Sequence, residues 1–398
     1  MELEDIRWCS KCWTPSTRPR ITFNEKGVCN ACQHSEAKKA INWRERQDFL
    51  RAICDSYRKG GGELDCIVPW SGGKDSIYVA YKMRDEFGMT PLLVTVLPHL
   101  ETEIGQWNRK NTCPGFEKME ITLKEDKYRS LAKKYFIEQG RPKHPWETAI
   151  SAVVINQAWK MKIPFIIYGE EGEQEYGGSD SQKTQWQYPV DKDYLMKFYW
   201  QDNLDWDIPP DNELDRIFFT QYSRFENWSP SKHADFAINK GMRSKPVRSV
   251  GTFTMWSQVS DYMQDLHSYL MMLKFGFGRC TADVAIAIRE GWKSRSEGLE
   301  LIEAYDGEFP NQLLDQYLEY FKMGYSVFCD VLATHANKEL LEIAGPILKD
   351  DHAIPQNWEG AKTSHGTSHI WYLQAWAAKH RRKGTKNELK SPERFDVR

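Results

Sequence analysis

The stretch of sequence that decides the fold is Leu64-Asp65-Cys66-Ile67-Val68-Pro69-Trp70-Ser71-Gly72-Gly73-Lys74-Asp75-Ser76. Its apolar half is typical of a short buried strand, and residues 77–87 have the apolar spacing of a helix. Residues 91–97 form a second apolar run. Because continuous apolar strands are typical of a parallel sheet covered on both faces, this strand–loop–helix–strand order predicts an α/β fold.

The loop at residues 71–76 has the composition of a phosphate-binding site. Two glycines let the backbone approach an anion closely, and the start of the next helix offers free N–H groups and a positive dipole end. Ser71 and Ser76 add hydroxyl donors, Lys74 adds positive charge, and Asp75 can hold Mg²⁺ against phosphate oxygens. The alternative is a glycine-rich turn that only caps a helix, but the order of strand, loop and helix favours the phosphate site.

This loop lacks the spacing of a Walker loop and resembles the SGGxDS signature of the PP-loop ATP pyrophosphatases. The resemblance implies that ATP is cleaved between its α- and β-phosphates. It implies that the diphosphate is held by Ser71, Gly72, Gly73, Lys74, Asp75 and Ser76. We expect the adenine near the end of the second strand, around Thr95, and a further ATP contact at Gly169.

Strands and helices continue to alternate up to about residue 248. Strands are predicted at residues 117–123, 163–168 and 216–220, and helices at residues 42–58, 127–138, 146–161 and 231–239. The fold class that follows is α/β, a doubly wound parallel sheet of the PP-loop (adenine nucleotide alpha hydrolase-like) type, with an N-terminal zinc module and a helical C-terminal region.

The part of the chain after Gly251 has helical spacing. The predicted helices are 263–275, 281–290, 294–305 and 311–322. Ser294 and Glu297 have the spacing of a capping box. We divide the chain into a four-cysteine zinc-binding module (1–40), an α/β PP-loop domain (41–248), a helical C-terminal domain (249–345) and a partly mobile extension (346–398).

Two Cys-x-x-Cys pairs, Cys9 with Cys12 and Cys29 with Cys32, stand at the N-terminus. Two such pairs sixteen residues apart are typical of tetrahedral Zn²⁺ sites. A site with four thiolates is closed, so the metal would be structural. Disulfides and free thiols are the other possibilities, and a cytosolic setting disfavours the first. The five other cysteines are scattered, as buried small apolar residues usually are.

An acidic run with flanking glycines, Gly169-Glu170-Glu171-Gly172-Glu173-Gln174-Glu175-Tyr176-Gly177-Gly178, follows the strand predicted at 163–168. Ligands of open α/β sheets bind at the carboxyl ends of strands. Glu170, Glu171 and Glu175 are therefore candidates for binding Mg²⁺ or accepting protons during catalysis, and the residue pattern does not choose among them. The alternative is a solvated acidic loop.

Composition narrows the class of protein. The 398-residue chain is 40% hydrophobic with a net charge of −2, which is typical of a soluble globular protein and gives no basic field for nucleic acid. No apolar run approaches the roughly 18 residues that a membrane span needs. The acidic start lacks the apolar segment of a signal peptide, so we expect a cytoplasmic protein without a membrane or nucleic-acid partner.

The N-terminal run resembles the opening of the N-acetyl sugar amidotransferases. The matching residues are Cys9-Ser-Lys-Cys12, Pro15, Thr17-Arg18-Pro19, Ile21, Phe23 and Gly27-Val28-Cys29-x-x-Cys32. Further matches are Ser71–Ser76, Thr102-Glu103-Ile104-Gly105 with Asn108, Gly169–Gly178, Lys274-Phe275-Gly276-Phe277-Gly278-Arg279, Thr281, Asp283, Ile288-Arg289 and Tyr305-Asp306-Gly307-x-Phe309-Pro310. Together they cover roughly residues 9–335. Residues 140–150 and those after about 336 depart from the family pattern.

The resemblance implies an AMP-forming C–N ligase that makes acetamidino sugars for bacterial surface polysaccharide, such as lipopolysaccharide O-antigen or a flagellin glycan. ATP and Mg²⁺ would activate the N-acetyl carbonyl of a sugar, expected to be nucleotide-linked, and ammonia would replace its oxygen. Lys74 and Asp75 would act on the phosphates, and Arg279, Arg289 and Glu103 would contact the sugar substrate. We expect further acceptor contacts within residues 140–150. Ammonia would come free or from a partner, and the resemblance suggests a glutaminase subunit and a cyclase-like subunit as that partner.

Two other functions use parts of the same pattern. PP-loop enzymes that thiolate tRNA or make lysidine often carry zinc modules. That function, however, predicts a basic face and a catalytic cysteine pair. The neutral charge and the isolated Cys66 and Cys113 disfavour that function. A non-catalytic scaffold with a partner-binding zinc module is the other possibility, and the intact loop at 71–76 argues against it.

Overall fold

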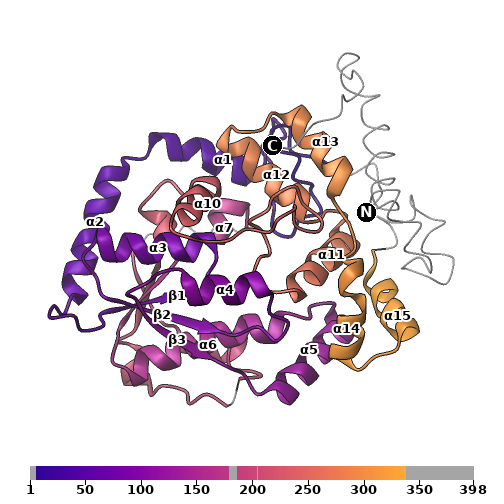
Figure 1. Ribbon diagram of the computed structural model, residues 1–398. Helices are drawn as coiled ribbons and strands as arrows, with labels where there is room; N and C mark the ends of the chain where they lie inside the picture. The colour runs from indigo at the N-terminus through magenta and orange to yellow at the C-terminus, as the bar shows by residue number, and fades with distance from the viewer. Residues whose placement is uncertain (1–5, 179–185, 204, 338–398) are drawn as a thin grey trace.

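A six-stranded sheet forms the centre of the computed structural model, which describes residues 6–178, 186–203 and 205–337 (Figure 1). The strand order is β3-β2-β1-β4-β6-β5. The strands are β1 (Cys66–Pro69), β2 (Pro91–Val96), β3 (Glu117–Ile121), β4 (Phe165–Tyr168), β5 (Tyr188–Pro189) and β6 (Phe218–Gln221). Neighbouring strands run parallel except β5, which pairs antiparallel with β6. The predicted doubly wound α/β fold is confirmed, with a mixed edge at β5 that the sequence did not predict.

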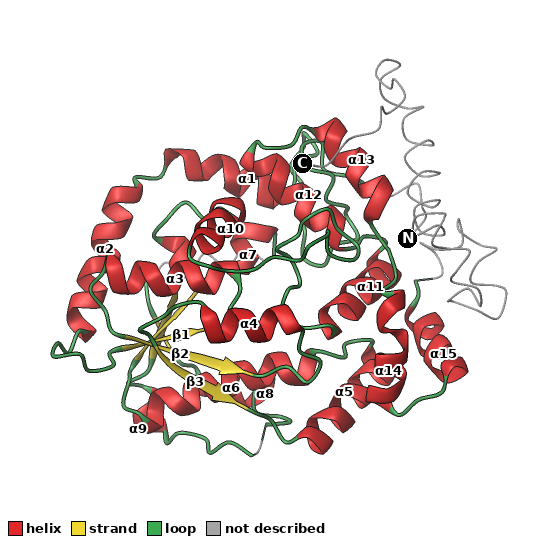
Figure 2. Ribbon diagram, in the orientation of Figure 1, coloured by secondary structure: helices red, strands yellow, loops and turns green. Residues whose placement is uncertain are grey.

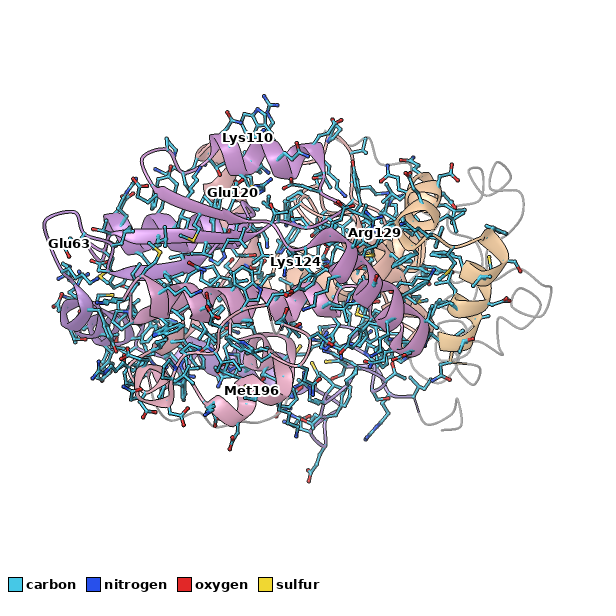
Figure 3. The ribbon with its side chains drawn as sticks, turned by 90° about the horizontal axis from the view of Figure 1, so that it is seen from below. Glu63, Lys110, Glu120, Lys124, Arg129 and Met196 are labelled. Carbon is cyan, nitrogen blue, oxygen red and sulfur yellow. The ribbon has the colours of Figure 1, made fainter. Side chains whose placement is uncertain are left out.

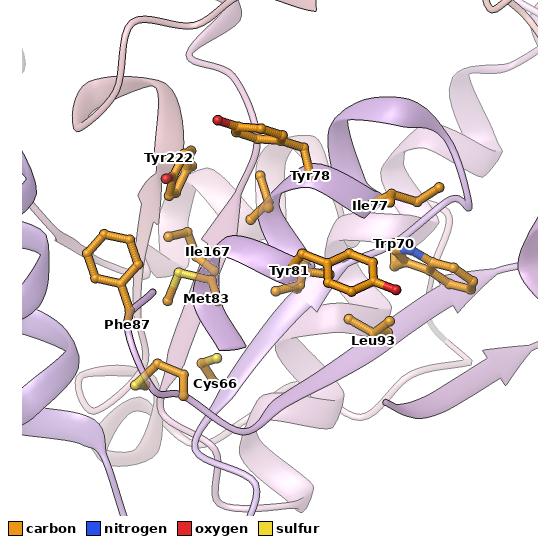
Figure 4. Close-up of a cluster of buried hydrophobic side chains, with 14 of the residues drawn as sticks. Cys66, Trp70, Ile77, Tyr78, Tyr81, Met83, Phe87, Leu93, Ile167 and Tyr222 are labelled. Atoms are coloured by element: carbon orange, nitrogen blue, oxygen red, sulfur yellow. The ribbon is translucent and has the colours of Figure 1, made fainter. Parts of the chain in front are cut away.

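Helices on one face of the sheet enclose an apolar core. This face carries α2 (Trp43–Tyr57), α3 (Lys74–Asp85) and α10 (Pro230–Asn239). Figure 4 shows Ile77, Tyr81 and Met83 of α3 lying over the strand residues Leu93 and Ile167. Because this packing fixes the position of α3, the loop that precedes it is held at the carboxyl end of β1.

The opposite face is covered by α6 (His144–Lys160), α8 (Lys192–Phe198) and α9 (Asp211–Leu214). The middle of α6 is apolar on almost every side, with Ala152, Val153 and Val154 all buried. A helix that is apolar on almost every side is buried by the surrounding protein on almost every side. Next to α6 lies α5 (Glu125–Gln139), which begins just after β3. Figure 2 shows helices above and below the strands, as doubly wound folds require.

The C-terminal region is helical, as the sequence predicts, and packs on α5. Its helices are α11 (Met263–Phe275), α12 (Arg279–Glu290), α13 (Arg295–Tyr305), α14 (Leu314–Phe321) and α15 (Tyr325–His335). Phe136 of α5 stacks on Phe321, with ring centroids 4.7 Å apart. The capping box at Ser294 and Glu297 is present at the start of α13. The predicted extension at 346–398 lies outside the described residues, and the domain boundaries stay predictions.

Several short elements escape the sequence patterns. They are α1 (Asn30–Ala37), α4 (Glu103–Asn111), α7 (Gly172–Tyr176), α8, α9, α15 and β5. Helix α7 lies inside the acidic run after β4, which was expected to be a loop. The N-terminal module packs on α12, where Ala285 and Ile288 touch the cysteine cluster. Residues of the N-terminal module and of α12 thereby lie at the same cleft as the loop at 71–76.

Candidate active site at the carboxyl end of the sheet

The loop between β1 and α3 needs glycine for two reasons. Gly72 has a φ of +73°, which side chains other than that of glycine rarely adopt. A Cβ there would lie 2.9 Å from Cγ of Arg109 and 3.2 Å from its backbone nitrogen. Gly73 precedes α3 without a side chain to cap it, so the first N–H groups of α3 stay available for an anion.

The two serines of the loop hold its shape. Ser76 Oγ donates to the carbonyl oxygen of Gly73 at 3.0 Å, and the backbone N–H of Ser71 donates to Ser76 Oγ at 3.3 Å. The N–H of Gly73 donates to Ser71 Oγ, also at 3.3 Å. These bonds fix a narrow backbone turn whose residues Ser71, Gly73 and Ser76 line a cleft.

Asp75 lies at the centre of the charges in this loop. Its carboxylate contacts Lys74 Nζ on one side and accepts a hydrogen bond from Nδ1 of the buried His233 at 2.9 Å on the other. Burial alone would raise the pKa of Asp75, but Lys74 and His233 outweigh it and hold the pKa below its ordinary value. Asp75 therefore stays ionised at neutral pH, and its oxygens are the kind that Mg²⁺ binds.

The cleft has a volume of about 590 Å³ and is built from several separate parts of the chain. One wall is the loop with Lys74 and Asp75. The N-terminal module contributes Thr14 and Arg18, the start of α6 contributes Lys143 and Trp146, and residues 254–261 close the C-terminal side together with α12 and Trp292. The volume falls in the range of small-molecule sites.

Glu170 is the carboxylate of the acidic run that lines this cleft, together with Tyr176 of the same run. It follows β4, the neighbour of β1, so it lies where the strand order reverses and where open α/β sheets bind ligands. The surrounding protein and the nearby charge of Asp75 raise the pKa of Glu170 to about 7. A carboxyl group with such a pKa is suited to proton transfer near neutral pH.

Glu171 and Glu175 have other surroundings. Glu171 is buried, 3.9 Å from Arg224, and its N–H donates to Ser223 Oγ. Glu175 is buried in α7 and accepts from Lys38 Nζ at 2.7 Å. Its pair with Lys38 ties the N-terminal module to the sheet domain. Neither glutamate lines the cleft.

The expected ATP contacts Thr95 and Gly169 do not line the cleft either. Thr95 is buried on β2 beside Glu120 of β3, and Gly169 is packed against the ring of Trp228. Glu103 is exposed at the start of α4, outside the cleft. Its neighbour Thr102 donates to the carbonyl oxygen of Val259, so this motif holds the cleft wall at 254–261 in place.

Both arginines proposed for the substrate line the cleft. Arg279 donates to Asp283 at 2.9 Å and to Ser257 Oγ at 3.2 Å. Arg289 lies 3.8 Å from Cys12 Sγ. The segment 140–150, where acceptor contacts are expected, supplies Lys143, which lies 3.3 Å from Asp261, and Trp146.

Sequence patterns missed several cleft residues. Residues 254–261 have no periodic pattern, and Asp283 holds them through hydrogen bonds from Thr254 and Ser257. His233 does not line the cleft, but it contacts Asp75 from α10, which is far from the loop in sequence. Arg18 was quoted only as part of a family motif. The match to that family was also the only signal for Asp283.

The four N-terminal cysteines form one buried cluster. Cys9 Sγ and Cys32 Sγ are 3.9 Å apart, Cys12 Sγ and Cys29 Sγ are 3.6 Å apart, and all four lie within 4.8 Å of one another. A tetrahedral Zn²⁺ with Zn–S bonds of about 2.3 Å separates its sulfurs by about 3.8 Å. The N–H groups of Lys11 and Cys29 point at Cys9 Sγ and favour its thiolate form. The cluster therefore has the donor set and spacing of a closed zinc site.

Comparisons with known proteins identify the C-terminal region. Residues 250–342 match the family described as LPS biosynthesis protein WbpG-like, C-terminal domain, in agreement with the relationship that the motifs indicate. An uncharacterized protein of Methanocaldococcus jannaschii, MJ1599, is 32% identical over 89 residues, which are 22% of this chain and 32% of that protein. The chain thus matches about a third of that relative's length.

A solved structure with a weak likeness is described as a predicted subunit of tRNA methyltransferase from Methanocaldococcus jannaschii. It shares 16% identity and a TM-score of 0.28, covering 52% of this chain and 87% of that one. A TM-score this low supports no conclusion about the fold, which is defined by the strand order of the sheet. None of the helices in the described ranges has both the length and the apolar content to cross a membrane.

Proposed function

We propose, from the premise that residues 250–342 are a WbpG-like C-terminal domain, that the chain is an ATP-dependent amidotransferase acting on an N-acetyl sugar. The observation that carries the proposal is one cleft that joins the glycine loop and Glu170 to residues of that domain. A surface-polysaccharide enzyme needs the sugar next to its chemistry, and this arrangement would provide it. ATP as substrate fits a cytoplasmic location.

The first step would transfer AMP to the amide oxygen. The acetyl oxygen attacks the α-phosphorus, a P–O bond forms, and the bond to the β-phosphate breaks with release of pyrophosphate. The N–H groups at the start of α3 and the Lys74 ammonium stabilise the charge that develops on the β- and γ-phosphates. Mg²⁺, when bound at Asp75, would supply further neutralisation of that charge.

The second step would replace the oxygen with nitrogen. Ammonia attacks the activated carbon, the C–O bond breaks, and AMP leaves with the former acetyl oxygen. The incoming nitrogen must lose a proton to do so, and Glu170 is the cleft carboxylate whose pKa lies near neutral pH. Glu175 and Glu171 serve structure instead, since each is buried outside the cleft.

Positive charge on the far wall suits an anionic sugar substrate. Arg18, Arg279 and Arg289 line the cleft opposite the glycine loop. Arg279 is partly neutralised by Asp283, while Arg18 has no carboxylate within hydrogen-bond reach in the described chain. A sugar linked to a nucleotide, or one that carries a carboxylate, would supply the missing negative charge. The zinc, in turn, would fix the N-terminal module that carries Arg18.

The chain would depend on a supplier of ammonia. Of the described cysteines, none lines the cleft, so the glutaminase chemistry is expected from a glutaminase subunit with a cyclase-like subunit. The same observation speaks against a tRNA-thiolating enzyme, since Cys66 and Cys113 are fully buried. Full glutamine-dependent turnover by the isolated chain would refute the need for partners.

The test is a product analysis. Purified protein is incubated with ATP, Mg²⁺, ammonium chloride and a panel of free, carboxylated and nucleotide-linked N-acetyl sugars, with Asp75→Ala as the inactive control. The proposal predicts AMP, pyrophosphate and a sugar whose mass has changed by the exchange of O for NH. ADP with orthophosphate, or turnover that depends on RNA and not on sugar, would contradict it.

A further inference from the structure

A second cavity, which the proposed mechanism does not use, lies on the α6 face of the sheet. It has a volume of about 590 Å³, and we name it the tyrosine chamber. Its walls come from α6, β4, β5, β6 and α8. The aromatic residues among its lining are Tyr168, Tyr188, Tyr194, Tyr199 and Phe219. Figure 3, in which Met196 marks α8, shows this helix at the outer boundary of the protein.

The chamber and the cleft beside the glycine loop share one lining residue. Glu170 lines both cavities, and no other described residue does. At the other end, Tyr194 is 49% exposed, so the chamber also reaches the surface. Glu170 can therefore be reached from solvent through the chamber, without passage along the glycine loop or the three arginines of the cleft.

The two cavities differ in the charged side chains that line them. Among the described residues that line the chamber, Glu170 and Asp191 are acids and none is lysine, arginine or histidine. The cleft, in contrast, is lined by five cationic side chains together with five carboxylates. Coulomb attraction therefore favours cations in the chamber, whereas the cleft offers groups of both signs.

The aromatic walls favour one type of cation. The ring of Phe219 lies 6.1 Å from that of Tyr168 and 5.7 Å from that of Tyr188, measured between centroids. Aromatic faces attract ammonium groups through their negative π-systems. Gln221, only 8% exposed, adds a carbonyl oxygen that has no hydrogen-bond partner in the described chain, and such an oxygen accepts from an N–H group.

We propose that the tyrosine chamber binds cationic amines and leads them to Glu170. The inference rests on the proposed function in one respect, since ammonium is then the cation that enters. A proton passes from ammonium to the Glu170 carboxylate, which leaves neutral ammonia with its lone pair free. Glu170 passes that proton to water in the chamber and is a carboxylate again. The lone pair of ammonia then forms the bond to the activated carbon, the C–O bond breaks as AMP leaves, and Glu170 accepts the second proton, which the new nitrogen loses. The chamber is far larger than an ammonium ion and therefore serves as a passage as well as a binding site.

The test uses tetramethylammonium chloride, a cation that aromatic faces bind and that cannot donate a proton or react. Its binding to the full-length protein is measured by saturation-transfer NMR without any turnover. The chamber predicts binding that Phe219→Leu weakens by about 3- to 10-fold, the loss expected for one cation–π face. Asp191→Asn keeps the side-chain cap of α8 and removes one charge, so a smaller loss of about 2-fold is expected. Asp193→Asn, on the same helix but outside the lining, is the matched control and should bind as the unaltered protein does.

Turnover gives the second readout. Tetramethylammonium should compete with ammonium but not with ATP, and Phe219→Leu should raise the KM for ammonium and leave the KM for ATP unchanged. Tetramethylammonium binding that none of the chamber variants changes would overturn the inference. A different result would separate the two proposals. If no condition gives sugar-dependent AMP formation, but Phe219→Leu still weakens the binding of tetramethylammonium, the proposed function is refuted and the chamber's specificity for cationic amines stands.

Discussion

Replacing Gly72 with alanine tests how the glycine loop is built. The left-handed backbone at this position costs a residue with a Cβ about 1–2 kcal/mol. The new Cβ would also lie 2.9 Å from Cγ of Arg109. Arg109 cannot move aside freely, because Glu101 and Glu120 each hold its guanidinium at 2.6 Å. Overpacking of this kind costs about 1–3 kcal/mol, so we expect the free energy of unfolding to fall by about 2–5 kcal/mol.

Gly60→Ala is the matched control, because Gly60 has nearly the same φ, +75°, and a Cβ there meets no atom within 4 Å. It should lose only the backbone part, about 1–2 kcal/mol. Urea unfolding followed by tryptophan fluorescence measures both variants, and calorimetry measures ATP affinity, which only Gly72→Ala should weaken. Equal losses of stability in the two variants, or unchanged ATP affinity in Gly72→Ala, would refute the contact between the loop and Arg109.

Three further predictions follow from the charges and the cysteines. The surrounding protein and the charge of Asp75 raise the pKa of Glu170 to about 7, so a base at this position is active above that pH. The rate with ammonium should therefore rise with pH through about 7, and Glu170→Gln should abolish that rise in a pH–rate profile. Glu175→Gln leaves the buried Lys38 without its counter-charge and should lower the free energy of unfolding in urea by about 3–5 kcal/mol, yet it should keep the pH profile; a lost profile would assign the base to Glu175. Cys12→Ser should remove about one equivalent of zinc in elemental analysis and loosen the N-terminal module toward protease, and full zinc content in this variant would contradict the four-cysteine site.

Local sequence patterns were sufficient to predict the central strands of the fold. The strands β1, β2 and β4 are continuous apolar runs because helices cover both of their faces, and such runs are visible in a sequence. The two residues of β5 are too few to form a pattern, and their pairing depends on β6, which follows them by almost thirty residues. Helices α8 and α9 are each at most seven residues long and leave no periodicity to detect.

The site shows the same division between local and distant interactions. The glycine loop at 71–76 was predictable because its strand, turn and helix are consecutive in the chain. The choice among Glu170, Glu171 and Glu175 was not, because it depends on α7: this short helix turns Glu175 toward Lys38 and leaves Glu170 at the cleft. The wall at 254–261 is shaped by distant partners such as Asp283 and Thr102, so no local signal could reveal it.

Transfer of the acetyl oxygen to AMP is the most direct test of the account. A sugar that supports turnover is prepared with oxygen-18 in its acetyl carbonyl, and the AMP formed with ATP, Mg²⁺ and ammonium is examined by mass spectrometry. The account predicts that the heavy oxygen appears in the phosphate of AMP. Heavy oxygen that stays in the sugar, or that appears in orthophosphate together with ADP, would contradict it.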